Sequence, residues 1–182
     1  MNKFKKLRFF IFTVFITLCL LAGCSTKEPL KTGVMDNPLH HYIRGMELLE
    51  KNNYQAAEER FQRAIVLDKK FAPALSAWAI VLAETASYEN NEKIREVKII
   101  EFLKQLEKAK KYADSKEEKF IVSVNGIRVF TKFIKAETFI SKAKASYNNA
   151  KNIMKLNTSY LPYYKNKYAA NYFMGLAFYK AL

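Results

Sequence analysis

Few residues of this 182-residue chain have the type and spacing that catalysis requires. His40 and His41 are adjacent, so on a helix their side chains would point about 100° apart and could not clamp one metal ion. The neighbours Glu58–Glu59 and Glu117–Glu118 are interpreted as solvated helix surface. The sequence also contains no G-x-S-x-G, P-loop, dinucleotide fingerprint or H-E-x-x-H. We therefore predict a protein that is not an enzyme and that uses no cofactor and no metal.

Cys24, near the N-terminus, is the one side chain with a clear chemical signature. Residues 1–8 carry four positive charges and no acid, and residues 9–21 are an unbroken run of apolar residues and threonines. That run is shorter than the roughly 20 residues of a transmembrane helix, which favours a secretory signal. The segment Leu21-Ala22-Gly23-Cys24 follows directly and resembles the lipobox of bacterial lipoproteins, with small residues before an obligatory cysteine.

This resemblance implies a diacylglycerol on the Cys24 thiol, cleavage after Gly23 and acylation of the new amino terminus by a fatty acid such as palmitate. The alternative is an uncleaved anchor or a chance cysteine after a hydrophobic run. The expected organisation is a signal peptide over residues 1–23, a lipidated linker over 24–36 and a helical domain over 37–182. Ser25 after the cysteine permits sorting to the outer membrane, so we expect a lipid-anchored protein of the bacterial cell envelope, facing the periplasm.

The remaining chain has the composition of a helical protein. It contains only five glycines and four prolines, and half of its residues are hydrophobic. Within residues 38–71, small residues and aromatics follow Gly45 at +9, +12, +16 and +19; they are Tyr54, Ala57, Phe61 and Ala64. This spacing resembles the tetratricopeptide repeat (TPR), a helical hairpin. An irregular all-α domain with one such hairpin is the alternative.

Elementary helix chemistry agrees with this interpretation. Asn37 can cap a first helix that has Pro38 in its first turn, and Asn52–Asn53 can form the turn and cap a second helix. Gly45 and Ala57 offer small surfaces that let two antiparallel helices approach closely.

Later repeats are looser. The expected second hairpin is lengthened by 11 residues, or three helical turns, so its packing face keeps its phase. A capping box over 114–118 would begin the third, and a final helix would be centred on Gly175. The positions expected to pack closely are Ala79, Leu106, Ala109, Gly126, Ala143, Tyr147 and Ala150. The predicted fold is all-α, a TPR-like α-solenoid of about three helical hairpins plus a C-terminal helix.

The TPR resemblance implies a groove lined by first-helix positions that would bind a partner segment. Carried over residue by residue, the partner-binding positions are Leu39, Tyr42, Met46, Leu49, Ile80, Tyr172, Leu176 and Tyr179. Tyr172, Leu176 and Tyr179 form one stripe at i, i+4 and i+7. Because buried and exposed stripes share the same period, this stripe could equally be core.

Charge is distributed unevenly along the chain. Residues 24–92 hold eight basic and ten acidic side chains, residues 93–137 twelve and seven, and residues 138–182 seven lysines and no acid. The basic half could attract anionic lipid headgroups or an acidic protein face, or it could simply keep helix faces soluble. Nucleic acid is an unlikely partner, because few lysines accompany the six tyrosines between Tyr160 and Tyr179.

We therefore expect a protein-binding adaptor or scaffold in an envelope assembly, such as pilus or secretion machinery, outer-membrane biogenesis or cell-wall biogenesis. Its partners would be an envelope protein or peptide segment, and the membrane through the lipid anchor. The alternative is a periplasmic small-ligand-binding lipoprotein that accompanies a transport system. A pocket between hairpins with converging polar groups would favour the alternative.

Overall fold

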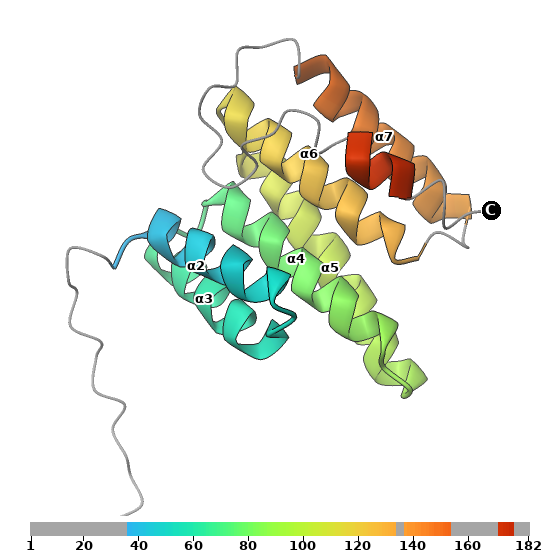
Figure 1. The fold of residues 1–182 in the computed structure, drawn as a ribbon, viewed down its shortest axis with the longest axis horizontal. Coiled ribbons are helices and arrows are strands. Elements are labelled where there is room, and N and C mark those ends of the chain that lie inside the picture. The colour runs from blue at the N-terminus through green and yellow to red at the C-terminus, as the bar shows by residue number, and fades with distance from the viewer. Residues whose placement is uncertain (1–35, 134–136, 154–170, 177–182) are drawn as a thin grey trace, which may run out of the picture. The chain divides into compact units, whose positions relative to one another are not determined.

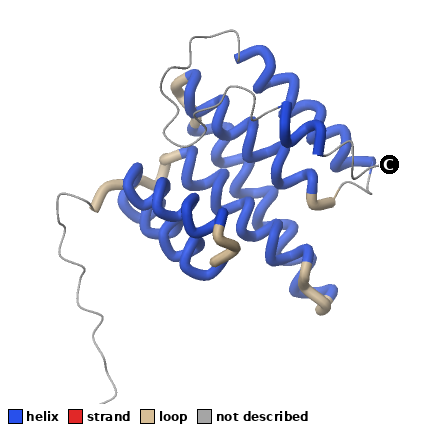
Figure 2. The backbone as a smooth tube through the Cα atoms, in the orientation of Figure 1, coloured by secondary structure: helices blue, strands red, loops and turns tan. Residues whose placement is uncertain are grey.

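Every regular element in the described part of the chain is a helix. The computed structural model describes residues 36–133, 137–153 and 171–176, and these residues contain no strand (Figures 1 and 2). The chain divides into two units, Met1–Gly33 and Val34–Leu182, and all described residues belong to the second. The predicted all-α class is thereby confirmed for them. The predicted signal peptide, Cys24 and Tyr179 lie outside the described residues.

Consecutive helices pack against each other in pairs. The helices are α2 (Pro38–Glu50), α3 (Tyr54–Leu67), α4 (Ala72–Ser87), α5 (Glu92–Tyr112), α6 (Lys116–Thr131) and α7 (Glu137–Ile153). The pairs are α2 with α3, α4 with α5 and α6 with α7. Helix α4 also packs on α2, α3 and α6, and α5 packs on α6, so the middle pair joins the other two (Figure 1).

The helix starts follow from the capping residues in the sequence. The Asn37 side chain accepts a hydrogen bond of 2.8 Å from the His40 backbone N–H, and Asn53 caps α3 in the same way. Ser115 accepts from the Glu118 N–H at 3.0 Å. The Glu118 carboxylate in return accepts from the Asp114 N–H at 3.0 Å, one residue before the position that a standard capping box uses. The predicted caps are thus confirmed.

Small residues bring α2 and α3 close together, as predicted. Ala57, Phe61 and Ala64 are fully buried, and Gly45 faces the Phe61 ring. A Cβ added at Gly45 would lie only 2.5 Å from Phe61 Cε1, so any larger side chain there must displace the ring. The first predicted contact between helices is therefore present in the structure.

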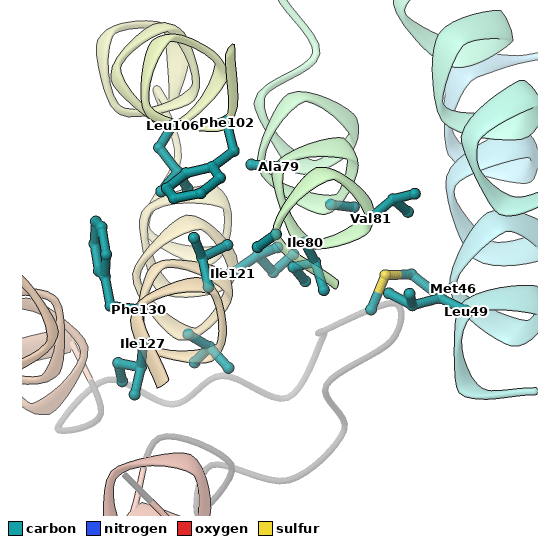
Figure 3. Packing of buried hydrophobic residues seen from close by; sticks show 14 of the residues in the cluster. Met46, Leu49, Ala79, Ile80, Val81, Phe102, Leu106, Ile121, Ile127 and Phe130 are labelled. Carbon is teal, nitrogen blue, oxygen red and sulfur yellow. The ribbon is translucent and has the colours of Figure 1, made fainter. Parts of the chain in front are cut away.

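Helix α4 is buried almost all round because it lies between its neighbours. Its six alanines are all buried, and they combine high helix propensity with a small surface that other helices can approach; they are Ala72, Ala74, Ala77, Ala79, Ala83 and Ala86. Figure 3 shows Val81 pointing toward Met46 and Leu49 of α2, while Ile80 points toward Ile121 of α6. On the α5 side, Ala79 lies beside Phe102 and Leu106 (Figure 3).

The later predicted packing positions are also buried or half-buried. Leu106 and Ala109 face the core from α5, which at 21 residues is the longest of the six helices, as expected for the lengthened hairpin. Ala143 and Ala150 are buried on α7, and Tyr147 packs partly buried against the core.

The helical residues 171–176 pack on one side only. Met174 is 5 % exposed, and Phe173 packs against the core with the Arg128 guanidinium 5.4 Å from its ring centroid. Gly175 is exposed, and an added Cβ there would meet nothing within 4 Å. The final helix expected around Gly175 is present over residues 171–176 of the described chain, but Gly175 itself is not a packing position. A glycine by itself does not show that a second helix lies against it.

Candidate functional site

The residues predicted to line a groove do not form one surface. Tyr42, Met46, Leu49 and Ile80 are at most 2 % exposed and belong to the hydrophobic core. Leu39 is half-buried and packs against that core. These large apolar side chains fill the space between neighbouring helices and are not open to a partner. The groove interpretation of these four buried residues is corrected accordingly.

The predicted partner-binding residues near the C-terminus differ in exposure. Tyr172 is 68 % exposed and Leu176 is half-buried, whereas Tyr179 lies outside the described residues. Of the two described residues of the predicted stripe, Tyr172 is therefore the exposed large side chain that a partner could contact.

Polar side chains connect α4 to α6 through the apolar core. The Asn125 amide donates to Ser76 Oγ at 2.9 Å, and both residues are fully buried. Two turns further along both helices, Lys132 Nζ lies 2.6 Å from the Glu84 carboxylate, whose side chain is 8 % exposed. Since residue pairs 76–125 and 84–132 advance together, α4 and α6 run parallel. These contacts fix the two helices in register.

A second polar cluster lies where the chain enters α2. Asp36, assigned to the linker from sequence, accepts hydrogen bonds from both Arg63 Nε and Nη2 on α3, the first at 3.2 Å. Its other contact is His41 Nε2, at 2.6 Å. The Arg63 guanidinium and then His41, as hydrogen-bond partners, hold the pKa of Asp36 at about 2, below its ordinary value of 3.8. The folded unit thus includes Asp36.

An aspartate beside a histidine can also serve general-base catalysis, but the geometry here does not suit it. His41 is buried, with 7 % of its surface exposed, and its Nδ1 faces Arg60 Nη1 at 3.5 Å. The nitrogen that would have to accept a proton from a substrate therefore faces a cation. We interpret the cluster as a clamp that ties the segment before α2 to α3.

Among the described helices, α5 carries the largest group of exposed large apolar side chains. Ile94, Val97 and Ile100 are 46 %, 65 % and 65 % exposed, and Tyr88 just before the helix is 70 % exposed. We call the three α5 residues Ile94, Val97 and Ile100 the α5 strip. Spacings of three keep the α5 residues on one broad face, away from the buried Phe102. Single exposed apolar residues are common, whereas three on one face of a helix form an exposed apolar surface.

A pocket of about 360 Å³ opens where the end of α5, the start of α6 and the end of α7 meet. Its apolar lining consists of Ala113, Val122 and Ile153. Its polar lining consists of Lys110, Lys119, Ser123, Asn149 and Asn152. The volume lies within the usual range for small-molecule sites.

The described residues contain no group of three or more histidine, cysteine, aspartate or glutamate side chains that could hold a metal ion. Within the same residues, no helix has the length and hydrophobicity needed to span a bilayer. Comparison with protein-family models, curated proteins and solved structures finds no match for this chain.

Sequence reasoning missed the α5 strip although a signal for it exists. Ile94, Val97 and Ile100 fall on the helix face opposite Phe102 and Leu106, so a helical wheel separates the two groups. The Asp36 clamp and the pocket have no such local signal, because their residues come from helices far apart in the sequence.

Proposed function

We propose that this protein is a lipid-anchored adaptor of the bacterial cell envelope, in which a TPR-like array of helical hairpins presents a contact surface to a protein partner. The lipobox ending at Cys24 supports the anchor, and the position of Ser25 supports an outer-membrane location facing the periplasm. The partner would be an envelope protein or peptide segment in a pilus, secretion, outer-membrane or cell-wall assembly.

The helix arrangement supports the repeat architecture. Among α2 to α7, backbone packing joins each pair only to the pair next to it in the chain, as in a solenoid. A side-chain ion pair of 2.7 Å between Arg128 and Glu50 also connects the third pair to the first. Parallel first helices, shown by the register of α4 and α6, are also typical of stacked hairpins.

The observation that carries the adaptor proposal is the α5 strip. Its exposed aliphatic side chains are flanked by Lys93 and Glu96, both exposed. Side chains of both signs beside an apolar centre suit a polypeptide with its own mixed charges better than a uniformly anionic surface. We therefore assign the partner contact to this strip in place of the buried first-helix positions.

Two experiments test the proposal. Cys24→Ala should leave an unprocessed or soluble protein in fractionated envelopes, because the anchor cannot be attached without the thiol. Mutant protein of mature size in the washed membrane fraction would contradict the anchor.

The contact surface is tested with a photo-crosslinking amino acid placed at Val97 in cells. It should yield a discrete adduct with an envelope protein. The matched control is Val66 on α3, which is equally exposed at 66 % but lies outside the α5 strip. Equal crosslinking at both positions, or none at Val97, would refute the assignment.

The pocket between the second and third pairs favours a second candidate function, a small-ligand-binding lipoprotein that accompanies a transport system. Its apolar floor and its lysine and asparagine side chains are the features that this alternative requires.

A further inference from the structure

The pocket at the ends of α5 and α7 has a distinctive charge. Lys110 and Lys119 line it from two different helices, and Asn149 and Asn152 line it from a third. No acidic side chain is among its lining residues. The residues that line this space therefore include two lysines and two asparagines beside its apolar side chains.

The polar lining side chains are available to a ligand. Lys110 pairs with Glu107 at 2.8 Å, but both side chains are more than 40 % exposed, and such surface pairs exchange readily with other anions. Lys119, Asn149 and Asn152 are also exposed. Amide N–H groups and lysine ammonium groups can both donate hydrogen bonds to an oxyanion.

The floor of the pocket favours a ligand with an apolar part. Val122 is 3 % exposed and Ala113 is 5 % exposed, so both are parts of the packed interior that the pocket reaches. Ser123 Oγ donates to the Lys119 backbone carbonyl at 2.7 Å, which leaves the hydroxyl oxygen as an acceptor. A ligand with a small hydrophobic group and one anionic end would match floor and lining together.

We propose that this pocket binds a small organic anion, with a carboxylate or similar group held by Lys110 and Lys119 and an apolar body against Val122. The proposal rests on the second candidate function and adds the ligand class to it. It is independent of the α5 strip, which lies toward the other end of the same helix.

The test uses three probes of matched shape, which are benzoate, benzamide and benzylammonium. The full chain is held in zwitterionic phospholipid nanodiscs, and binding is measured by saturation-transfer NMR with empty nanodiscs as background. Benzoate should bind about tenfold more tightly than benzamide, and benzylammonium should bind least, because two charge-assisted contacts favour the anion.

Variants locate the site. Lys110→Gln and Lys119→Gln should each weaken benzoate binding about threefold to tenfold and leave benzamide binding unchanged, since only the charge is removed. Lys93→Gln removes the same charge from α5 outside the pocket and should change benzoate binding less than about twofold. Asn149→Trp fills the pocket from an exposed helix position and should abolish the binding of all three probes.

The outcomes separate the two levels of the proposal. Equal binding of benzoate and benzamide would overturn the anion class and leave the small-ligand function standing. Absence of binding by all three probes would overturn both. Equal losses in the Lys93→Gln and Lys119→Gln variants would show unspecific attraction by the basic chain and would also overturn the site.

Discussion

Replacing Gly45 by alanine tests the close approach of α2 and α3 at Phe61. The added Cβ would lie 2.5 Å from Phe61 Cε1, 2.8 Å from Cδ1 and 3.0 Å from Cζ. Phe61 is fully buried, and its ring lies 6.3 Å from the Tyr42 ring, centroid to centroid. The ring cannot swing into solvent, so α2 and α3 must move apart or the ring must leave its preferred rotamer.

The expected magnitude is the difference of two effects. Overpacking a buried contact costs about 1–3 kcal/mol. Alanine in place of glycine inside a helix returns roughly 0.8–1.0 kcal/mol. Gly45→Ala should therefore lower the free energy of unfolding by up to about 2 kcal/mol. Gly45→Leu, which adds three more carbons against the same ring, should cost more.

Urea unfolding followed by circular dichroism measures this change, and Gly175→Ala is the matched control. Nothing lies within 4 Å of a Cβ at Gly175, so that substitution should be neutral or slightly stabilising. A second test combines Gly45→Ala with Phe61→Leu, because the smaller side chain leaves room for the methyl group. In that background Gly45→Ala should be less costly or even stabilising.

A Gly45→Ala variant as stable as the Gly175→Ala variant would refute the predicted clash with Phe61. The same holds if the cost of Gly45→Ala is unchanged in the Phe61→Leu background, since the two residues would then not be coupled.

Three further predictions concern the polar contacts. Because its pKa in the folded state is depressed to about 2, Asp36 contributes stability that is fully present above about pH 4 and is lost as the pH falls toward 2. The urea midpoints of the parent protein and of the Asp36→Asn variant should therefore converge in acid. A difference between the two midpoints that stays constant from pH 6 to pH 2 would contradict the clamp. Lys132→Met leaves the largely buried Glu84 carboxylate without its partner at 2.6 Å and should lower the free energy of unfolding by about 1–3 kcal/mol. This loss is smaller than for a fully buried pair because the Lys132 side chain is 25 % exposed. Lys132→Arg should retain most of the stability in thermal melts. Ser76→Ala removes the acceptor of the buried Asn125 amide and should cost about 1–2 kcal/mol in urea unfolding, while Ser141→Ala at an exposed position should change little.

Local chemistry in the sequence predicted much of the helix pattern. Asn37, Asn53 and Ser115 are helix caps because their side-chain oxygens satisfy backbone N–H groups within three residues. The spacing of Ala57 and Phe61 was also predictive, because residues four positions apart lie on one helix face. Such signals depend on neighbours in the chain, so they can be found without knowing the fold.

The placement of the groove residues could not be found in this way. Ile80 and Tyr172 both lie on apolar helix stripes, yet one is 1 % exposed and the other 68 %. A stripe shows that one face is apolar, and it does not show whether another helix covers that face. For the same reason Gly45 faces a ring and Gly175 faces open space.

The sequence by itself determined the helical class of the described residues, the helix starts and the small-residue contact of the first pair. Tertiary structure alone decided that α4 is covered on nearly every side, that Asp36 reaches Arg63, and that side chains from α5, α6 and α7 surround one pocket. The physical reason is the separation along the chain of the residues that interact. Caps and helix faces are set by residues within a few positions of each other, whereas burial and pockets depend on how separate helices pack.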